Sequence, residues 1–192
     1  MQECRACELW KGTTQAVIGD GRRNAPLMLV GEQPGDREDI EGRPFVGPAG
    51  RILDRGLELA EIDHDEVFLT NVVKHFRYKA RGKRRIHQRP DRSHVAACRP
   101  WLEAELKLVR PDALVCLGAT AAQALVGPGV RIGRDRGRPL DSELAELVTV
   151  TTHPSAILRV RGKSEREAAM EAFVADLGSV AAWVRESASR SR

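Results

Sequence analysis

The sequence predicts an α/β protein, a three-layer α/β/α sandwich with a central four-stranded parallel sheet. Short apolar runs alternate with helical patterns along the chain. The apolar runs are typical of strands buried on both faces, as in parallel sheets. The 192 residues, with 42% hydrophobic content, are enough for one sizeable core. We therefore expect a single domain over residues 1–192 without internal repeats, and a frayed tail at 187–192.

Four short apolar runs predict the buried strands. They are Leu27–Val30, Val67–Thr70, Ala113–Leu117 and Leu147–Val150. Helical patterns lie between and after them, at Pro48–Leu59, Asp91–Val109, Ala119–Val126 and Ser164–Glu186. The first helix starts with a proline, whose missing N–H costs little in a first turn. The second is amphipathic, and we expect Pro100 to kink or divide it. Ser164 and Glu167 have the spacing of a capping box.

An unusual segment follows each predicted strand. These segments are Gly31-Glu32-Gln33-Pro34-Gly35, Asn71, Gly118-Ala119-Thr120 and His153-Pro154-Ser155. Ligands of open α/β sheets bind beyond the carboxyl ends of the strands. The sequence therefore predicts that the four segments converge on one edge of the sheet, where Gly and Pro suit turns that present backbone N–H groups.

Residues 74–92 form the most basic segment, with nine Lys or Arg against one Asp. Phe76 and Tyr78 lie among these charges, as do His75 and His87. Such a segment suits a phosphate backbone, because neutralised phosphates release counterions. A solvated basic loop or a localisation patch is the alternative. The net charge of +4 and the pI near 9.1 also favour an acidic partner.

No N-terminal apolar run resembles a signal peptide, and no stretch is long enough to span a bilayer. We expect a cytoplasmic, monomeric protein without a membrane partner. Its four cysteines are then not expected to form structural disulfides. The C-x-x-C pair of Cys4 and Cys7 indicates metal, cluster or redox chemistry.

The ordered motifs resemble the uracil-DNA glycosylase superfamily, and most closely its iron–sulfur branch, family four. The resemblance covers nearly the whole chain, from Cys4-x-x-Cys7 through GEQPG, GRPFVGPAG, TNVVK and Cys98-Arg99-Pro100 to THPS. The KRRIHQRP stretch is similar to the covalent-linking subgroup known as UdgX. The resemblance implies that uracil is excised from DNA and that the resulting sugar becomes bonded to His87.

The resemblance also implies a [4Fe–4S] cluster with a structural role. Cys4, Cys7 and Cys98 match three of the four family cysteines, and His75 stands at the fourth position. Histidine is a competent ligand of cluster iron. The alternatives are Cys116 as a ligand, a three-ligand cluster, or zinc, which also accepts three Cys and one His. Cys116 lies in a strand pattern typical of a buried thiol.

A substrate pocket follows from the same resemblance. Asn71 would pair with the N3–H and O4 edge of uracil, Phe45 would stack on its ring, and His153 would donate to its O2, assisted by the backbone N–H of Gln33. The remaining expected substrate and DNA contacts are Gly31, Gly35, Asp39, Ser155, the Gly47–Gly50 turn, Lys83, Arg84 and Arg85. Gly35 stands where some relatives carry a Tyr that excludes thymine.

The group that would attack C1′ of the sugar is where this chain differs most from the relatives it resembles. Some relatives carry a water-positioning Asp where this chain has Gln33, and an amide is a poor base. Glu32 and Asp39 are the nearest remaining carboxylates. The neutral imidazole of His87 could attack C1′ directly, with Glu32 accepting the other ring N–H and fixing the tautomer.

Three other functions compete with covalent linkage. The first is an ordinary family-four glycosylase that uses water. The second is a non-catalytic iron–sulfur protein that binds nucleic acid through the basic segment. The third is a nucleotide-binding enzyme with GEQPG as its phosphate loop, although that motif lacks the Walker lysine spacing and the G-x-G-x-x-G pattern. The expected partner is uracil-containing DNA, with a preference for single strands.

Overall fold

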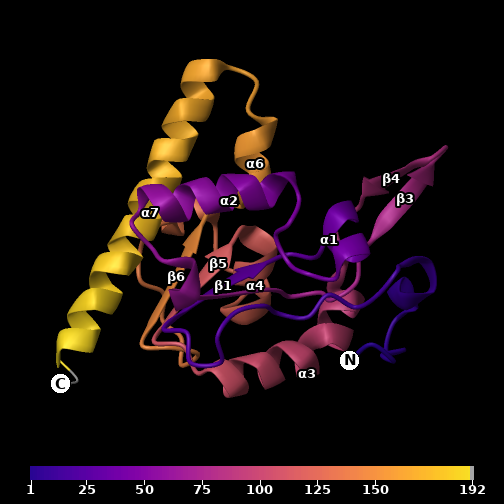
Figure 1. Ribbon diagram of the computed structural model, residues 1–192, viewed down its shortest axis with the longest axis horizontal. Coiled ribbons are helices and arrows are strands. Elements are labelled where there is room, and N and C mark those ends of the chain that lie inside the picture. The colour runs from indigo at the N-terminus through magenta and orange to yellow at the C-terminus, as the bar shows by residue number, and fades with distance from the viewer. Residues whose placement is uncertain (191–192) are drawn as a thin grey trace.

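The computed structural model describes residues 1–190 and has a four-stranded parallel sheet at its centre (Figure 1). The strands are β1 (Leu27–Gly31), β2 (Val67–Asn71), β5 (Ala113–Leu117) and β6 (Leu147–Thr151), in the order β2-β1-β5-β6. Each contains one of the predicted apolar runs. Nearly all strand residues are buried, which explains why the runs show no polar alternation.

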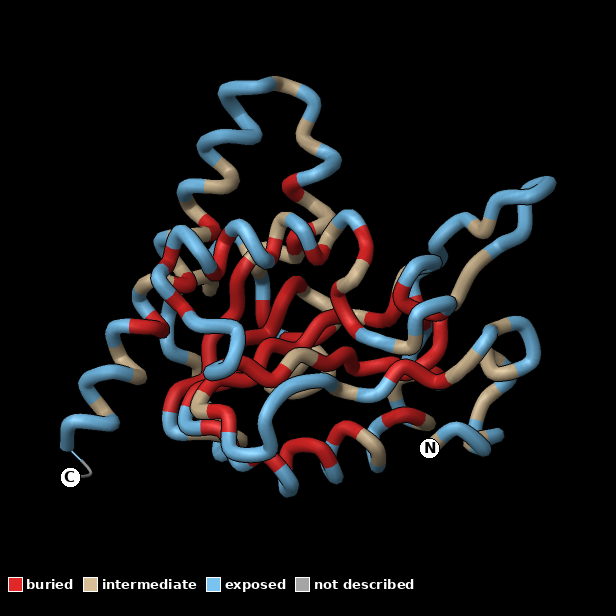
Figure 2. The backbone as a smooth tube through the Cα atoms, in the orientation of Figure 1, coloured by how far each residue is buried: buried red, intermediate tan, exposed pale blue. Residues whose placement is uncertain are grey.

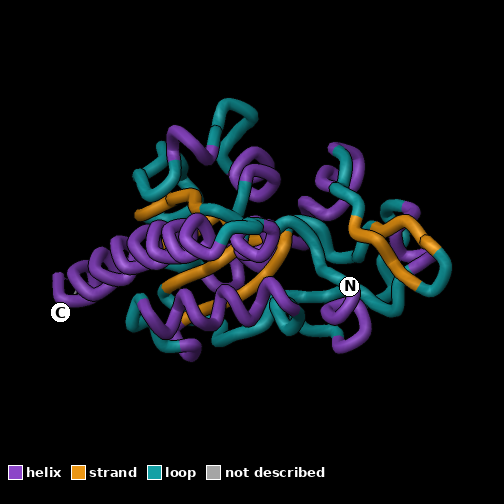
Figure 3. The backbone as a smooth tube through the Cα atoms, turned by 90° about the horizontal axis from the view of Figure 1, so that it is seen from above, coloured by secondary structure: helices purple, strands orange, loops and turns teal. Residues whose placement is uncertain are grey.

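Helices cover both faces of the sheet and complete the predicted three layers, as Figure 3 shows from above. One face carries α2 (Pro48–Leu59), α6 (Pro154–Arg159) and α7 (Lys163–Arg190), and the other carries α3 (Arg92–Val109) and α4 (Ala119–Leu125). Along β1, Leu27 and Leu29 point into the core under α2, α6 and α7, whereas Met28 and Val30 point into the core under α3 and α4. This two-sided burial confirms the α/β/α sandwich. No helix within residues 1–190 is long and apolar enough to cross a membrane.

The predicted helix bounds agree best with the structure where the sequence marks a helix end, as the proline at the start of α2 does. Helix α2 has the predicted bounds and begins with its proline. Helix α3 passes through Pro100 undivided, so of the two expected effects, a kink or a division, the division is wrong. Pro100 and Ala96, whose carbonyl loses its helical partner, are both exposed to solvent, which can hydrate that carbonyl.

Helix α7 begins one residue before the predicted start and extends beyond the predicted end. Ser164 therefore lies within the first turn instead of capping it. Residues 187–190 are helical, and the Ser189 hydroxyl donates to the Arg185 carbonyl at 3.0 Å. Fraying of this end stays a prediction. Residues 191–192 lie outside the described part of the chain.

The basic segment forms a β-hairpin that the sequence did not predict. Strand β3 (Tyr78–Arg81) pairs antiparallel with β4 (Arg84–His87), and Gly82 adopts a φ of 59° in the turn. The hairpin projects from the body of the molecule, and Figure 2 shows that most of it is exposed. Short helices were also missed, namely α1 (Asp36–Glu41), α5 (Ile132–Asp135), α6 and the 3-10 turns Glu8–Gly12 and His64–Glu66.

Candidate active site

The four strand-end segments meet at the carboxyl edge of the sheet. Gly31 at the end of β1 is paired with Asn71 at the end of β2. After β5, the Gly118 N–H donates to the Thr151 carbonyl at the end of β6, at 2.9 Å. His153 follows two residues after that strand end. The parallel topology thus brings residues from distant parts of the sequence together at the crevice beyond the carboxyl ends of the strands.

The missing side chain of Gly31 allows Asn71 and Phe45 to pack directly against its backbone. A Cβ added at Gly31 would lie 2.4 Å from the Asn71 Oδ1 and 2.7 Å from the Phe45 ring. Both side chains are almost fully buried. Phe45 has a φ of 57°, unusual for a residue with a bulky side chain, and a Cβ at Gly50 would clash with its carbonyl. The backbone is therefore shaped to present an aromatic ring and an amide at one point.

His153 faces the same point from the end of β6. Its ring centroid lies 6.2 Å from that of Phe45. Its Nδ1 accepts the Ser155 backbone N–H at 3.1 Å, so in the neutral ring the proton resides on Nε2. Burial lowers the pKa of His153 to about 4, with further contributions from Arg159 and His87. At neutral pH this side chain is consequently an uncharged N–H donor.

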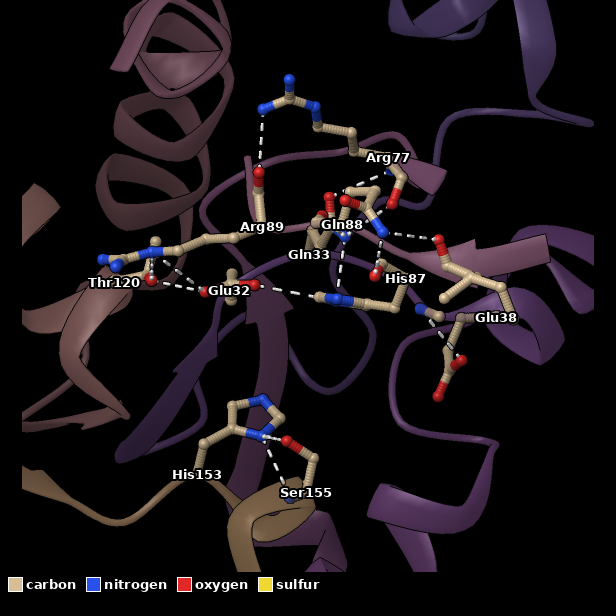
Figure 4. Close-up of polar contacts among 12 residues, drawn as sticks. Glu32, Gln33, Glu38, Arg77, His87, Gln88, Arg89, Thr120, His153 and Ser155 are labelled. Atoms are coloured by element: carbon tan, nitrogen blue, oxygen red, sulfur yellow. Dashed lines mark hydrogen bonds and ion pairs between the residues drawn. The ribbon is translucent and has the colours of Figure 1, made fainter. Parts of the chain in front are cut away.

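His87 lies on β4, and its Nε2 is 2.9 Å from the Gln33 side-chain nitrogen (Figure 4). The Gln33 amide cannot turn over freely, because its oxygen accepts the Arg77 backbone N–H at 3.0 Å and its nitrogen donates to the Gln88 carbonyl at 2.9 Å. The same nitrogen also lies 3.2 Å from the Arg77 carbonyl, so its two N–H groups serve three partners. Because an amide nitrogen donates and does not accept, the 2.9 Å contact makes Nε2 the acceptor of a shared N–H. The His87 proton then resides on Nδ1, so this nitrogen pair defines the tautomer.

Glu32 lies on the same side of the His87 ring as Gln33. Its Oε1 is 3.6 Å from Nε2, whereas the sequence suggested that it would hold the opposite ring nitrogen. The other carboxylate oxygen accepts a very short hydrogen bond from the Thr120 hydroxyl, and the Arg89 Nε lies 4.0 Å away. A negative charge is thus fixed beside Nε2.

Burial lowers the pKa of His87 below its ordinary value, and Arg159 acts in the same direction, while Glu32 and Glu38 oppose the shift. The side chain is 51% exposed, so a large partner could reach it. At neutral pH the imidazole is unprotonated on Nε2 and carries a usable lone pair.

Arg85 fastens the hairpin to the body of the protein. It donates to Asp39 at 2.6 Å and to Asp36 at 2.5 Å, and its guanidinium lies over the rings of Phe76 and Tyr78. Asp39 is fully buried and also accepts from Thr14, so its carboxylate is occupied by the protein. The structure therefore places Asp39 and Arg85 in an anchor next to the pocket. Lys83 and Arg84, at the tip, are exposed.

Glu38 is a residue that the sequence reasoning missed. Its carboxylate accepts the Gly35 N–H at 3.1 Å and the Gly47 N–H at 3.0 Å, which ties the loop after β1 to the loop that carries Phe45. A Glu three residues after the N-cap, which accepts the N-cap N–H as in one half of a capping box, is the signal that could have revealed it. Thr120 was also missed as an individual residue, although its segment was recognised.

The cysteines of the proposed cluster occupy one region near the N-terminus. Burial raises the pKa of the Cys98 thiol, and the Cys7 and Cys4 thiols lie close enough to raise it further. The Cys98 sulfur accepts the Lys74 N–H at 3.4 Å, and the Cys4 sulfur accepts the Trp101 indole N–H at 3.3 Å. His75 is buried next to Lys74, with a pKa lowered by burial.

Chemically, three thiols and a neutral imidazole fit iron–sulfur ligation, and N–H···S bonds are usual around such clusters. Within residues 1–190, no three His, Cys, Asp or Glu side chains are arranged to hold a single metal ion. The ligands of a four-iron cluster each bind a different iron, so they stand farther apart than the ligands of one ion. Cys116 is fully buried in β5, and burial raises its pKa to about 12.

A parallel sheet covered by helices on both faces, with a polar site at the carboxyl ends of its strands, defines an open α/β protein that binds its ligand in a crevice at that edge. Residues 18–178 match the model of the uracil DNA glycosylase superfamily. The chain belongs to that superfamily.

Curated relatives carry the name "Type-4 uracil-DNA glycosylase". The protein from Thermotoga maritima is 37% identical over 172 residues, covering 89% of this chain and 86% of that protein. The Pyrobaculum aerophilum protein is 33% identical over 180 residues, covering 88% of each. The Sulfurisphaera tokodaii protein is 35% identical, covering 81% of this chain and 71% of that protein.

Proposed function

We propose that this protein excises uracil from DNA as a repair glycosylase and then remains bonded to the abasic sugar through His87. Uracil excision is supported by the superfamily and by relatives named for that activity. The covalent step is supported by one observation above all: the unprotonated Nε2 of His87 faces the edge of the sheet where Phe45, Asn71 and His153 gather.

Uracil must leave the base stack before the pocket can take it. Asn71 would read the N3–H and O4 edge with its amide, and Phe45 would stack on the ring. Gly31 has no side chain, which lets both of them approach its Cα closely. A base that is already unstacked costs less to bind, so single-stranded DNA is the preferred substrate in this proposal. The reaction needs only one copy of the chain.

Cleavage of the C1′–N1 bond moves its electron pair onto uracil, mainly to O2. The neutral His153 would donate its Nε2–H to that oxygen, and the backbone N–H of Gln33 would assist. The sugar is left with positive charge, which the Glu32 carboxylate stabilises from beside Nε2. Ser155 and the Gly47–Gly50 turn, at the start of α2, would hold phosphates.

The lone pair of His87 Nε2 would then form the new bond to C1′. The imidazolium so produced loses its Nδ1 proton to solvent, and the uracil anion gains one, so charge and atoms balance. For the attack, Nε2 must exchange its hydrogen bond with Gln33 for the sugar carbon. This route differs from hydrolysis only in the nucleophile.

Ordinary turnover with water fits the fold and the relatives equally well, and one gel separates the two. Protein is mixed with single-stranded DNA that contains one uracil and then heated in detergent. A shifted band that resists this treatment supports the His87 bond. Free uracil with an abasic strand and no shifted band would establish the water route. Neither product, together with binding that ignores uracil, would identify a non-catalytic DNA-binding protein.

The rate of adduct formation should depend on pH through His87. Because the pKa of this imidazole is lowered, the unprotonated form persists below pH 6.5, the ordinary value, and the half-maximal rate should lie below that pH. His153, with a pKa of about 4, stays neutral throughout this range. Single-turnover rates on an abundant single-stranded substrate would measure the midpoint.

Glu32→Gln provides the matched control for the pH profile. Glu32 raises the pKa of His87, so its neutralisation should move the midpoint to still lower pH, whatever it does to the maximal rate. A midpoint at or above pH 6.5, or a shift in the opposite direction, would exclude His87 as the titrating nucleophile.

We also propose that Cys4, Cys7, Cys98 and His75 hold a [4Fe–4S] cluster. When bound, the cluster would join the N-terminal segment, the start of the basic segment and α3 covalently. The proximity of the Cys4, Cys7 and Cys98 thiols and the neutral, buried imidazole of His75 support this ligand set. The protein side chains would supply ligation and N–H···S contacts, and no step of the glycosylase reaction passes through the iron.

Paired substitutions at His75 test the fourth ligand. His75→Cys restores four thiolates and should retain iron and acid-labile sulfide at the wild-type ratio. His75→Ala should lower both, because one iron loses its protein ligand. Cys116→Ala is the control and should leave both unchanged, since its thiol is buried in β5. Zinc in place of iron, or full iron retention in His75→Ala, would contradict the assignment.

A further inference from the structure

A groove of about 860 Å³ lies between α3 and α4, on the face of the sheet opposite α2 and α7. Its floor is apolar and includes Val95, Leu102 and Ala124, whereas Arg89, Arg92 and Arg99 stand along it. None of the steps above uses this groove. An apolar floor beside cations suits a ligand with a flat, apolar face and a negative charge.

The groove is continuous with the catalytic edge. Arg89 and Thr120 line it, and the Arg89 Nε donates to the Thr120 hydroxyl at 3.2 Å. The same hydroxyl donates to Glu32, whose other oxygen lies 3.6 Å from His87 (Figure 4). A strand whose sugar reaches His87 therefore passes the mouth of the groove when it continues beyond Arg89.

The charges of the groove favour an anion. Asp91 is paired with Arg77 at 3.0 Å, and Glu103 with Arg99 at 2.8 Å, so the acidic residues of the lining are already neutralised. The Arg92 side chain makes no ion pair or hydrogen bond within residues 1–190. The Arg89 side chain is 65% exposed, and only its Nε is engaged, by Thr120 and Glu32. The Arg92 guanidinium and the two terminal nitrogens of Arg89 can therefore contact phosphates without breaking an internal pair.

We infer that the α3–α4 groove binds a nucleotide that flanks the target uracil on the same DNA strand. Its base lies on the apolar floor, and its phosphate contacts Arg89 and Arg92. This inference rests on the proposed function, since it assumes DNA at the catalytic edge. The groove would extend the grip on single strands beyond the flipped nucleotide, using base stacking and charge without reading sequence.

A protein segment with apolar and acidic side chains is the competing occupant. The arginines would suit it as well, but it has no need of a groove that opens beside Glu32 and Thr120. Continuity with the catalytic edge therefore favours the DNA strand.

Ala96→Trp tests the groove, because Ala96 is an exposed residue of α3 in its lining and a large ring there would fill it. Ala104→Trp is the matched control, an exposed alanine on the same helix outside the groove. Affinity is measured with uracil-free single-stranded oligothymidines that extend progressively farther on either side of one abasic-site analogue. Circular dichroism and thermal melting verify that both variants fold.

For the wild type, affinity should rise in a step when the oligonucleotide grows on one side. Ala96→Trp should remove at least about fivefold of that gain, equivalent to about 1 kcal/mol of apolar contact with the base, and Ala104→Trp should keep it. Arg92→Glu should lower the slope of log affinity against log salt by about 0.7, the loss of one single-strand phosphate contact.

Equal affinities of Ala96→Trp and wild type for every oligonucleotide, with no change of slope in Arg92→Glu, would overturn the inference and leave a protein segment as the occupant. Failure of the proposed function looks different. In that case the shortest uracil oligonucleotide gives neither adduct nor free uracil with the wild type, whatever the flank contributes to binding.

Discussion

Replacing His87 with alanine is expected to abolish the denaturation-resistant band completely, because no other imidazole is placed to bond C1′. The second imidazole at the site, that of His153, has its Nδ1 engaged by Ser155 and its Nε2 protonated, so it has no free lone pair at neutral pH. Free uracil should still appear if water enters the space left by the ring, since the leaving-group contacts remain. The gel and a uracil-release assay on the same samples measure both products.

His64→Ala is the control for that experiment. His64 is an exposed histidine on the turn before β2, with only a 3.7 Å approach to Asp54, and its loss should change neither product. A stable band that persists in His87→Ala would mean that another residue forms the bond. A wild-type protein without the band would remove the covalent step but leave uracil excision standing.

Lys74→Met is expected to destabilise the protein by about 3–5 kcal/mol, the usual cost of leaving one charge of a buried pair without its partner. Lys74 is 1% exposed, and its ammonium donates to Glu105, Thr70 and the Asn71 carbonyl at 2.6–2.7 Å. Burial lowers the pKa of this lysine, and the Glu105 carboxylate counteracts the shift. Urea unfolding of samples with equal iron content would measure the change.

The double variant Lys74→Met/Glu105→Leu separates charge from packing. It removes both ions together, so much of the lost stability should return. Gly19 and Thr70 then lose their carboxylate partner, which keeps the recovery incomplete. A double variant that is less stable than Lys74→Met would show that the pair is not the source of the effect. Because the lysine holds the Asn71 carbonyl, uracil affinity should follow the same order.

The parallel sheet was predictable because its strands are buried on both faces and carry uninterrupted apolar runs. Helix α2 was predictable because Pro48 marks its start. The hairpin was not, because Lys and Arg obscure the alternation of its strands. Its stability comes from distant partners: Arg85 pairs with Asp39, and the Tyr78 hydroxyl donates to the Gly12 carbonyl at 2.7 Å. Pairings between remote segments leave no local pattern in a sequence.

The active site was likewise predictable only in part from the sequence. Motif positions were enough to nominate Asn71, Phe45, His153 and His87 as candidates. The proton positions were not predictable, since the His87 tautomer depends on a Gln33 amide that is oriented by the backbone of Arg77 and Gln88. Glu32 was expected on the opposite ring nitrogen for the same reason. A sequence names the groups of a site, but only their hydrogen-bond partners decide which atom carries a proton.

The hairpin contributes nothing to the interior of the protein. Among the described residues, neither hydrophobic core includes any from 77 to 87. The cores therefore do not depend on the hairpin, and its main tie to the interior is the pair between Arg85 and the buried carboxylate of Asp39. Under the proposed covalent function, the segment that carries the nucleophile of a single-use protein is thus structurally separable from the cores that hold the uracil pocket.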